Sequence, residues 1–146
     1  MPADEILSSG NADAVFVRAA VALGSAFAFL GIALGAFGAH SLRESLGTDG
    51  TMIFETGVRY QMYHAIALIM TGLLARTSVG TSSTLRLSLV LFVLGIVLFS
   101  GSLYVLALAQ FRWIGFVTPL GGLAFLGGWA AMFYAVLRYR TRVSAH

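Results

Sequence analysis

Three ionisable side chains stand at the start of an apolar run and are the residues best suited to chemistry. Glu55, Arg59 and His64 fall within ten residues, and no further charge follows until Arg76. A carboxylate and a guanidinium four residues apart on a helix can form an ion pair, or can bind a charged headgroup or partner. An imidazole inside an apolar segment can handle a proton or contact a ligand. The alternative is a neutral histidine that only packs, hydrogen-bonded to a serine or tyrosine across the helix interface.

Other polar side chains gather near the same end of the apolar segments. At about 100° per residue, Gly57, Tyr60, Gln61, His64 and Thr71 share one helical face, so we expect His64 to point into the protein. We expect its partner to be Tyr60, Ser100, Ser102 or Tyr104. The candidate ligand- or partner-contacting residues are therefore His64, Tyr60, Gln61, Arg59, Glu55, His40, Ser100, Ser102, Tyr104 and Thr118.

The sequence predicts no catalytic residue, no metal and no cofactor. There is no cysteine, which excludes thiol nucleophiles and thiolate ligands. His40 and His64 could ligate a haem or a metal, but the apolar spans contain no carboxylate and no third histidine. The motifs of serine hydrolases, zinc proteases and phosphate-binding loops are absent. We therefore expect a protein that is not an enzyme.

Composition predicts an integral membrane protein. Hydrophobic residues make up 58% of the chain and charged residues only 10%, whereas a soluble domain carries about 25% charged residues. Charge-free apolar runs cover residues 19–39, 60–75, 87–111 and 113–137. The second reaches only about 24 Å as a helix, short of a hydrocarbon core of about 30 Å. We therefore expect the second helix to begin before Arg59 or to be shielded by its neighbours.

The predicted organisation is a tail (1–18), a four-helix transmembrane domain (19–137) and a basic tail (138–146). The spans lie at about 19–39, 57–75, 87–111 and 113–137. With four spans, six of the nine arginines lie on the side of both termini, which predicts cytoplasmic termini in a bacterial inner membrane. Because the arginines flank apolar segments instead of clustering, we expect no nucleic-acid partner.

Two local features carry predictions about shape. The segment SLRESLG (41–47) predicts a short helix ended by Gly47, with a turn at Asp49-Gly50. Pro119 lies seven residues into the fourth apolar run, and we expect it to kink that helix near Gly115.

Small residues recur every seven positions and predict how the helices pack. In lipid, small side chains let helix backbones approach closely, and a seven-residue repeat predicts a left-handed supercoil. The fold class is therefore an all-α, antiparallel, left-handed four-helix bundle. The repeats are Gly24, Gly31 and Gly38; Gly57, His64 and Thr71; Ser88, Gly95, Ser102 and Ala109; and Gly121, Gly128 and Ala135.

Four blocks of the chain resemble one protein family. They are GAFGAHSL (35–42), FETGVRYQMYHAIAL (54–68), LFSGSLYVLAL (98–108) and TPLGGLAFLGGW (118–129). In order and spacing they are similar to the small inner-membrane proteins of domain of unknown function 423, which also resemble the eukaryotic transmembrane protein 256. The resemblance implies a compact four-helix membrane protein. It implies no activity, cofactor or catalytic residue.

Two functional hypotheses follow. The first is a non-enzymatic accessory or scaffold subunit, which binds a larger membrane complex or a lipid through its helical faces and outer loop. The second is a small transporter or proton-linked permease that uses the polar cluster around His64, with a homo-oligomer completing the pathway. A membrane enzyme is the weakest alternative.

Overall fold

The structure is a computed structural model that describes residues 3–77 and 79–143, nearly all of them helical. The first half contains α1 (Ala3–Phe37), the π-helical segment η1 (Gly38–Leu42) and α2 (Arg43–Ala75). The second half contains α3 (Ser83–Gly95), the π-helical segment η2 (Ile96–Ser100) and α4 (Gly101–Ala109). The 3₁₀ helix η3 (Arg112–Phe116) and α5 (Thr118–Val143) complete it.

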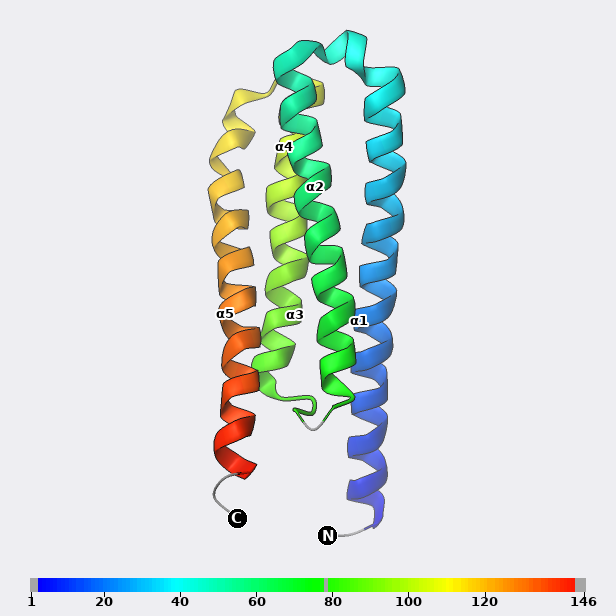
Figure 1. The fold of residues 1–146 in the computed structure, drawn as a ribbon, viewed down its shortest axis with the longest axis vertical. Helices are drawn as coiled ribbons and strands as arrows, with labels where there is room; N and C mark the ends of the chain where they lie inside the picture. The colour runs from blue at the N-terminus through cyan, green and yellow to red at the C-terminus, as the bar shows by residue number, and fades with distance from the viewer. Residues whose placement is uncertain (1–2, 78, 144–146) are drawn as a thin grey trace.

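These elements form long helical rods that lie side by side (Figure 1). The rods are α1, α2, the continuous run α3–η2–α4, and α5, and successive rods point in opposite directions. Both chain ends and the 76–82 connection lie at one end, here called the lower end. Residues 38–50 and 110–117 form the upper end. α2 packs against α1, α3, η2 and α4, while α5 packs mainly against α3 and η2.

Within the described residues, three helical stretches are long and apolar enough to cross a membrane: Asn11–His40, Ser83–Ala109 and Trp113–Arg138. α2 is not among them. As expected, it begins well before Arg59, at Arg43, and the rods around it bury its polar face. Gln61, His64 and Thr71 are each at most 5% exposed. The polar residues of α2, the least apolar of the long helices, are thus buried against the more apolar helices around it.

The described residues of the predicted N-terminal tail are helical from Ala3 onward. Two local expectations about shape change in the structure. The turn expected at Asp49-Gly50 is wrong, because the chain turns at Gly47 alone and both residues lie within α2. Gly47 has φ 64° and ψ −175°, a conformation open to glycine because it lacks a Cβ atom.

The kink expected at Pro119 is also wrong. α5 begins at Thr118, after the 3₁₀ segment η3, so Pro119 lies in the first turn of the helix. There a backbone N–H would have no helical partner in any case, and the fixed φ of proline suits the start of a helix. Pro119 therefore helps to begin α5 and does not bend it.

Small residues lie where the rods touch, as the seven-residue repeats predict. Gly24, Gly31 and Gly38 of the first rod are buried against α2. A Cβ atom added at Gly24 would lie 2.7 Å from the carbonyl oxygen of Ala65. Between α3 and α5 the contacts are reciprocal: the ring of Phe125 covers Gly95, and the ring of Phe92 covers Gly128. The repeat fails at its end, where Ala109 is exposed.

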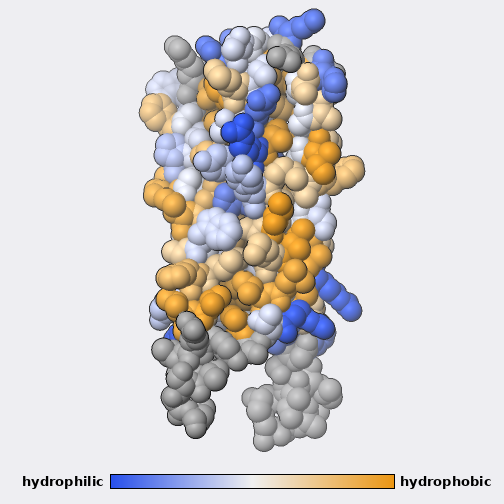
Figure 2. Space-filling model, viewed as in Figure 1, coloured by the Kyte–Doolittle hydropathy of each residue, from blue (hydrophilic) through white to orange (hydrophobic). Residues whose placement is uncertain are grey.

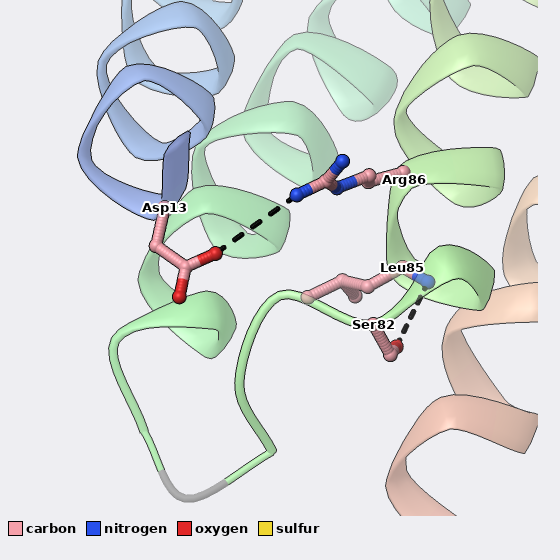
Figure 3. A network of polar contacts seen from close by, with 4 residues as sticks. All are labelled: Asp13, Ser82, Leu85 and Arg86. Atoms are coloured by element: carbon pink, nitrogen blue, oxygen red, sulfur yellow. Dashed lines mark hydrogen bonds and ion pairs between the residues drawn. The ribbon is translucent and has the colours of Figure 1, made fainter. Parts of the chain in front are cut away.

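At the lower end, polar contacts lie at the start of α3 and between α3 and α1 (Figure 3). The Ser82 hydroxyl accepts a hydrogen bond of 3.2 Å from the backbone N–H of Leu85 and caps α3. The Arg86 guanidinium lies 4.0 Å from the Asp13 carboxylate, and both side chains are about half exposed. This ion pair joins the first rod to the third.

Candidate functional site

Gln61 connects three rods through its side-chain amide. The Nε2 atom donates a hydrogen bond of 2.8 Å to the Phe27 carbonyl of α1. The Oε1 atom accepts a bond of 2.9 Å from the Tyr104 hydroxyl of α4. Because a carbonyl oxygen only accepts, these contacts determine which way the amide points. Gln61 is 4% exposed, so a buried polar group is satisfied at both ends.

His64 is bonded at both ring nitrogens. Nδ1 lies 2.8 Å from the Tyr60 carbonyl oxygen, one turn earlier in α2. Nε2 lies 3.2 Å from the indole Nε1 of Trp129 in α5. A carbonyl can only accept and an indole N–H can only donate, so Nδ1 carries the proton and Nε2 is the acceptor. The geometry therefore requires a neutral imidazole.

Aromatic rings surround this imidazole. The His64 ring stacks on Phe125, with 3.4 Å between the ring centroids and 9° between the planes. Phe92 lies 5.6 Å away in a tilted arrangement, and Tyr60 lies 6.2 Å away in a stacked one. His64 is 5% exposed. Burial among apolar rings opposes a charge on the ring, because a buried cation without a counter-charge is costly.

A further polar contact of the upper half joins α4 to α5. The Ser102 hydroxyl lies 2.8 Å from the Thr118 hydroxyl and also donates to the Phe99 carbonyl. Ser100, in the π-helical segment, is fully buried, and its hydroxyl has no hydrogen-bond partner among the residues that the structure describes. The Ser102–Thr118 contact therefore ties the start of α5 to α4.

The remaining candidates lie at the upper surface. Glu55 and Arg59 are exposed on α2 and line a pocket between α1 and α2. In the part of the chain that the structure describes, these two side chains do not form the ion pair that their spacing suggested. His40 is exposed in η1, whereas His64 is buried in α2. No group of three or more His, Cys, Asp or Glu side chains among the described residues is placed to hold a metal ion.

The predicted candidates thus form separate contacts and not one cluster. The expected partners of His64 are corrected: Tyr60 contributes its backbone carbonyl, Tyr104 binds Gln61 instead, and Ser102 binds Thr118. Sequence reasoning did not single out Trp129. Its indole N–H is a donor that needs an acceptor inside an apolar run, and this requirement was the available signal.

Figure 2 shows a mostly apolar surface on which hydrophilic residues gather over the upper half of α2 and at the ends of the rods.

A family model described as "Protein of unknown function (DUF423)" matches residues 34–122 of this chain. The chain belongs to this family. The match includes all ten candidate residues and most of the contacts described above, and it confirms the resemblance carried by the four sequence blocks.

Relatives in this family are named as membrane proteins. The chain is 41% identical over 119 residues to the UPF0382 membrane protein YwdK of Bacillus subtilis (strain 168), covering 82% of this chain and 96% of YwdK. It is 42% identical over 118 residues to the UPF0382 inner membrane protein YgdD of Escherichia coli (strain K12), covering 81% and 88%. No solved structure matches the chain. The DUF423 chain is therefore a member of a membrane-protein family of unknown function.

Proposed function

We propose that this DUF423 protein is a non-enzymatic accessory or scaffold subunit that binds a larger membrane complex or a lipid. The observation that carries the proposal is that the buried side chains of Gln61 and His64 are fully hydrogen-bonded within the protein. Both nitrogens of His64 and both polar atoms of Gln61 are engaged within the protein. Groups that are fully occupied by structural bonds specify how helices fit together and leave no site for a reaction or a passing solute.

The proposed architecture is a left-handed bundle in which all four rods span the inner membrane. Three apolar helices support it, and α2 lies against the other rods with its polar face buried. The lower end would face the cytoplasm with both termini, because positive charge is enriched on that side of membrane proteins. The arginines assigned to the lower end are Arg18, Arg76, Arg86, Arg138, Arg140 and Arg142.

A small transporter or proton-linked permease is the second candidate. The polar side chains in the upper half of the rods favour it, since intramembrane polar groups often mark a pathway. Proton transfer at His64 would have to break its bond to Trp129 or to the Tyr60 carbonyl. Transport therefore predicts an opened state in which water reaches the interior, and the scaffold role predicts none.

Native mass spectrometry of the protein, released gently from its own membrane, tests the scaffold role. Co-release with a larger membrane protein at fixed stoichiometry is the expected result, and the mass would identify that partner. Release only as a monomer or a homo-oligomer, without a bound lipid, would overturn the proposal.

Thiol labelling separates the two candidates. The chain has no cysteine, so Thr71→Cys and Ser102→Cys each introduce a single probe at a position at most 4% exposed. In open membrane fragments a polar maleimide should leave both unlabelled, while the exposed control Ser83→Cys should react. Rapid labelling at position 71 or 102 in the intact fold would favour transport.

A further inference from the structure

A pocket at the upper end lies between the first rod and α2. Its volume is about 210 Å³, far more than the 10–15 Å³ or so that one water requires. The first rod and η1 contribute two glycines and an alanine, and α2 contributes apolar, hydroxyl and charged side chains. The lining includes Gly35, Glu55, Val58 and Arg59.

The two charged residues of this pocket are available to a ligand. Glu55 and Arg59 stand one helical turn apart, and both are exposed. Neither makes an ion pair or a side-chain hydrogen bond with any residue that the structure describes. The pocket therefore presents one negative and one positive group that do not neutralise each other by direct contact.

The depth of these charges matches that of lipid headgroups. Arg59 directly precedes the charge-free run of residues 60–75, so a spanning α2 would place it where hydrocarbon gives way to polar headgroups. Glu55 lies one turn further out. Between the two charged residues in sequence, Val58 lies against Gly35 of α1, and together they give the pocket an apolar wall.

We propose that this pocket binds a phospholipid whose headgroup carries both a phosphate and a primary ammonium. The phosphate lies on the Arg59 guanidinium, which matches phosphate oxygens with paired N–H donors. The ammonium lies on the Glu55 carboxylate and donates hydrogen bonds to it. The glycerol end follows the apolar wall at Gly35 and Val58.

Charge complementarity selects this lipid over two others. A headgroup with phosphate alone would place its negative charge near Glu55 without an ammonium to offset it. A trimethylated ammonium has no N–H to donate to the carboxylate. The inference deepens the proposed function by naming the lipid that the subunit holds.

Native mass spectrometry of the purified, delipidated full chain tests this site, with dioleoyl phosphatidylethanolamine, phosphatidylcholine and phosphatidylglycerol added in turn. We expect phosphatidylethanolamine to be retained about two- to fivefold better than either other lipid, the range of one partly exposed charge contact. Glu55→Gln should abolish that preference. Arg59→Gln should weaken retention of all three phospholipids.

Two matched variants serve as controls. Glu44→Gln removes an exposed carboxylate of α2 outside the pocket, and Arg76→Gln removes an arginine at the lower end. Equal retention of the three lipids, a preference for phosphatidylglycerol, or pocket variants that behave like these controls would each overturn the site. The scaffold role is tested separately, by co-release of a protein partner. The lipid experiment can therefore fail without contradicting the scaffold role.

Discussion

Among the described glycines, Gly121 lies closest to the backbone of another rod, and changing it gives the sharpest test of the packing. An added Cβ atom would lie 2.7 Å from both the Cα and the Cβ of Phe99, and closer still to its backbone nitrogen. Real Cβ atoms essentially never approach a neighbour closer than 3.0 Å. The obstructing atoms are mostly backbone, so no rotation of a flexible side chain can relieve the contact. Gly121→Ala must move α5 away from η2.

The loss in free energy of unfolding can be judged from the contacts between α5 and the third rod that this movement weakens. Separating the two rods weakens the reciprocal contacts of Phe92 with Gly128 and of Phe125 with Gly95. It also stretches the 2.9 Å hydrogen bond from the Ser88 hydroxyl to the Gly128 carbonyl. Overpacking of this kind costs up to about 3 kcal/mol, and alanine regains about 1 kcal/mol over glycine in a helix. We expect Gly121→Ala to lower the free energy of unfolding by about 2 kcal/mol.

The neighbouring glycine supplies the control. A Cβ atom at Gly122 would meet only the ring of Phe99, at 3.9 Å, an ordinary contact. Gly122→Ala should therefore be neutral, or more stable by up to about 1 kcal/mol. Reversible unfolding in mixed micelles, followed by circular dichroism with increasing denaturing detergent, measures both variants. Equal stability of the two variants would refute the packing of α5 on η2.

Three further outcomes are expected in the same assay. Gln61→Leu should cost about 1–3 kcal/mol, because the Tyr104 hydroxyl loses its acceptor inside the protein; an unchanged midpoint would contradict that bond. Trp129→Phe should cost about 1 kcal/mol by removing the donor to His64, with helical content retained; a stabilised variant would argue against it. Asp13→Asn should change stability by less than about 1 kcal/mol, because its ion pair is half exposed; a larger loss would show that the lower-end contact is underestimated.

Much of the architecture could be predicted from the lengths of the apolar runs and from the helical period of the sequence. Hydropathy located three of the apolar rods closely, and the short second run correctly suggested a helix that begins earlier and is sheltered. The helical period placed Gly57, Gln61, His64 and Thr71 on one buried face. Tyr60 was expected on the same face but is exposed, because it lies at the edge of that face. Family membership was readable from four short blocks and is confirmed by the family match. Handedness and orientation in the membrane stay predictions.

The hydrogen-bond partners of the buried side chains could not be predicted in the same way. His64 bonds to a residue 65 positions away and Gln61 to one 43 positions away. Such pairs depend on the rotation and register of one rod against another. The π-helical segment Ile96–Ser100 alters that rotation, because each π turn adds residues relative to an α turn. A shift of one residue moves a side chain by about 100°, so the face that α4 presents cannot be extrapolated from α3.

The sequence by itself determined that this chain is a helical membrane protein, which side of α2 faces inward, and most of the positions where small residues let rods approach closely. Those properties follow from composition and from a period of 3.6 residues, both of which are local. Only the tertiary structure decided that both ring nitrogens of His64 are hydrogen-bonded, one to the Tyr60 carbonyl and one to the Trp129 indole. It also decided that Pro119 lies in the first turn of a helix, and that Glu55 and Arg59 line a pocket without pairing. These outcomes depend on contacts between rods, and a linear pattern does not encode how neighbouring surfaces are rotated against each other.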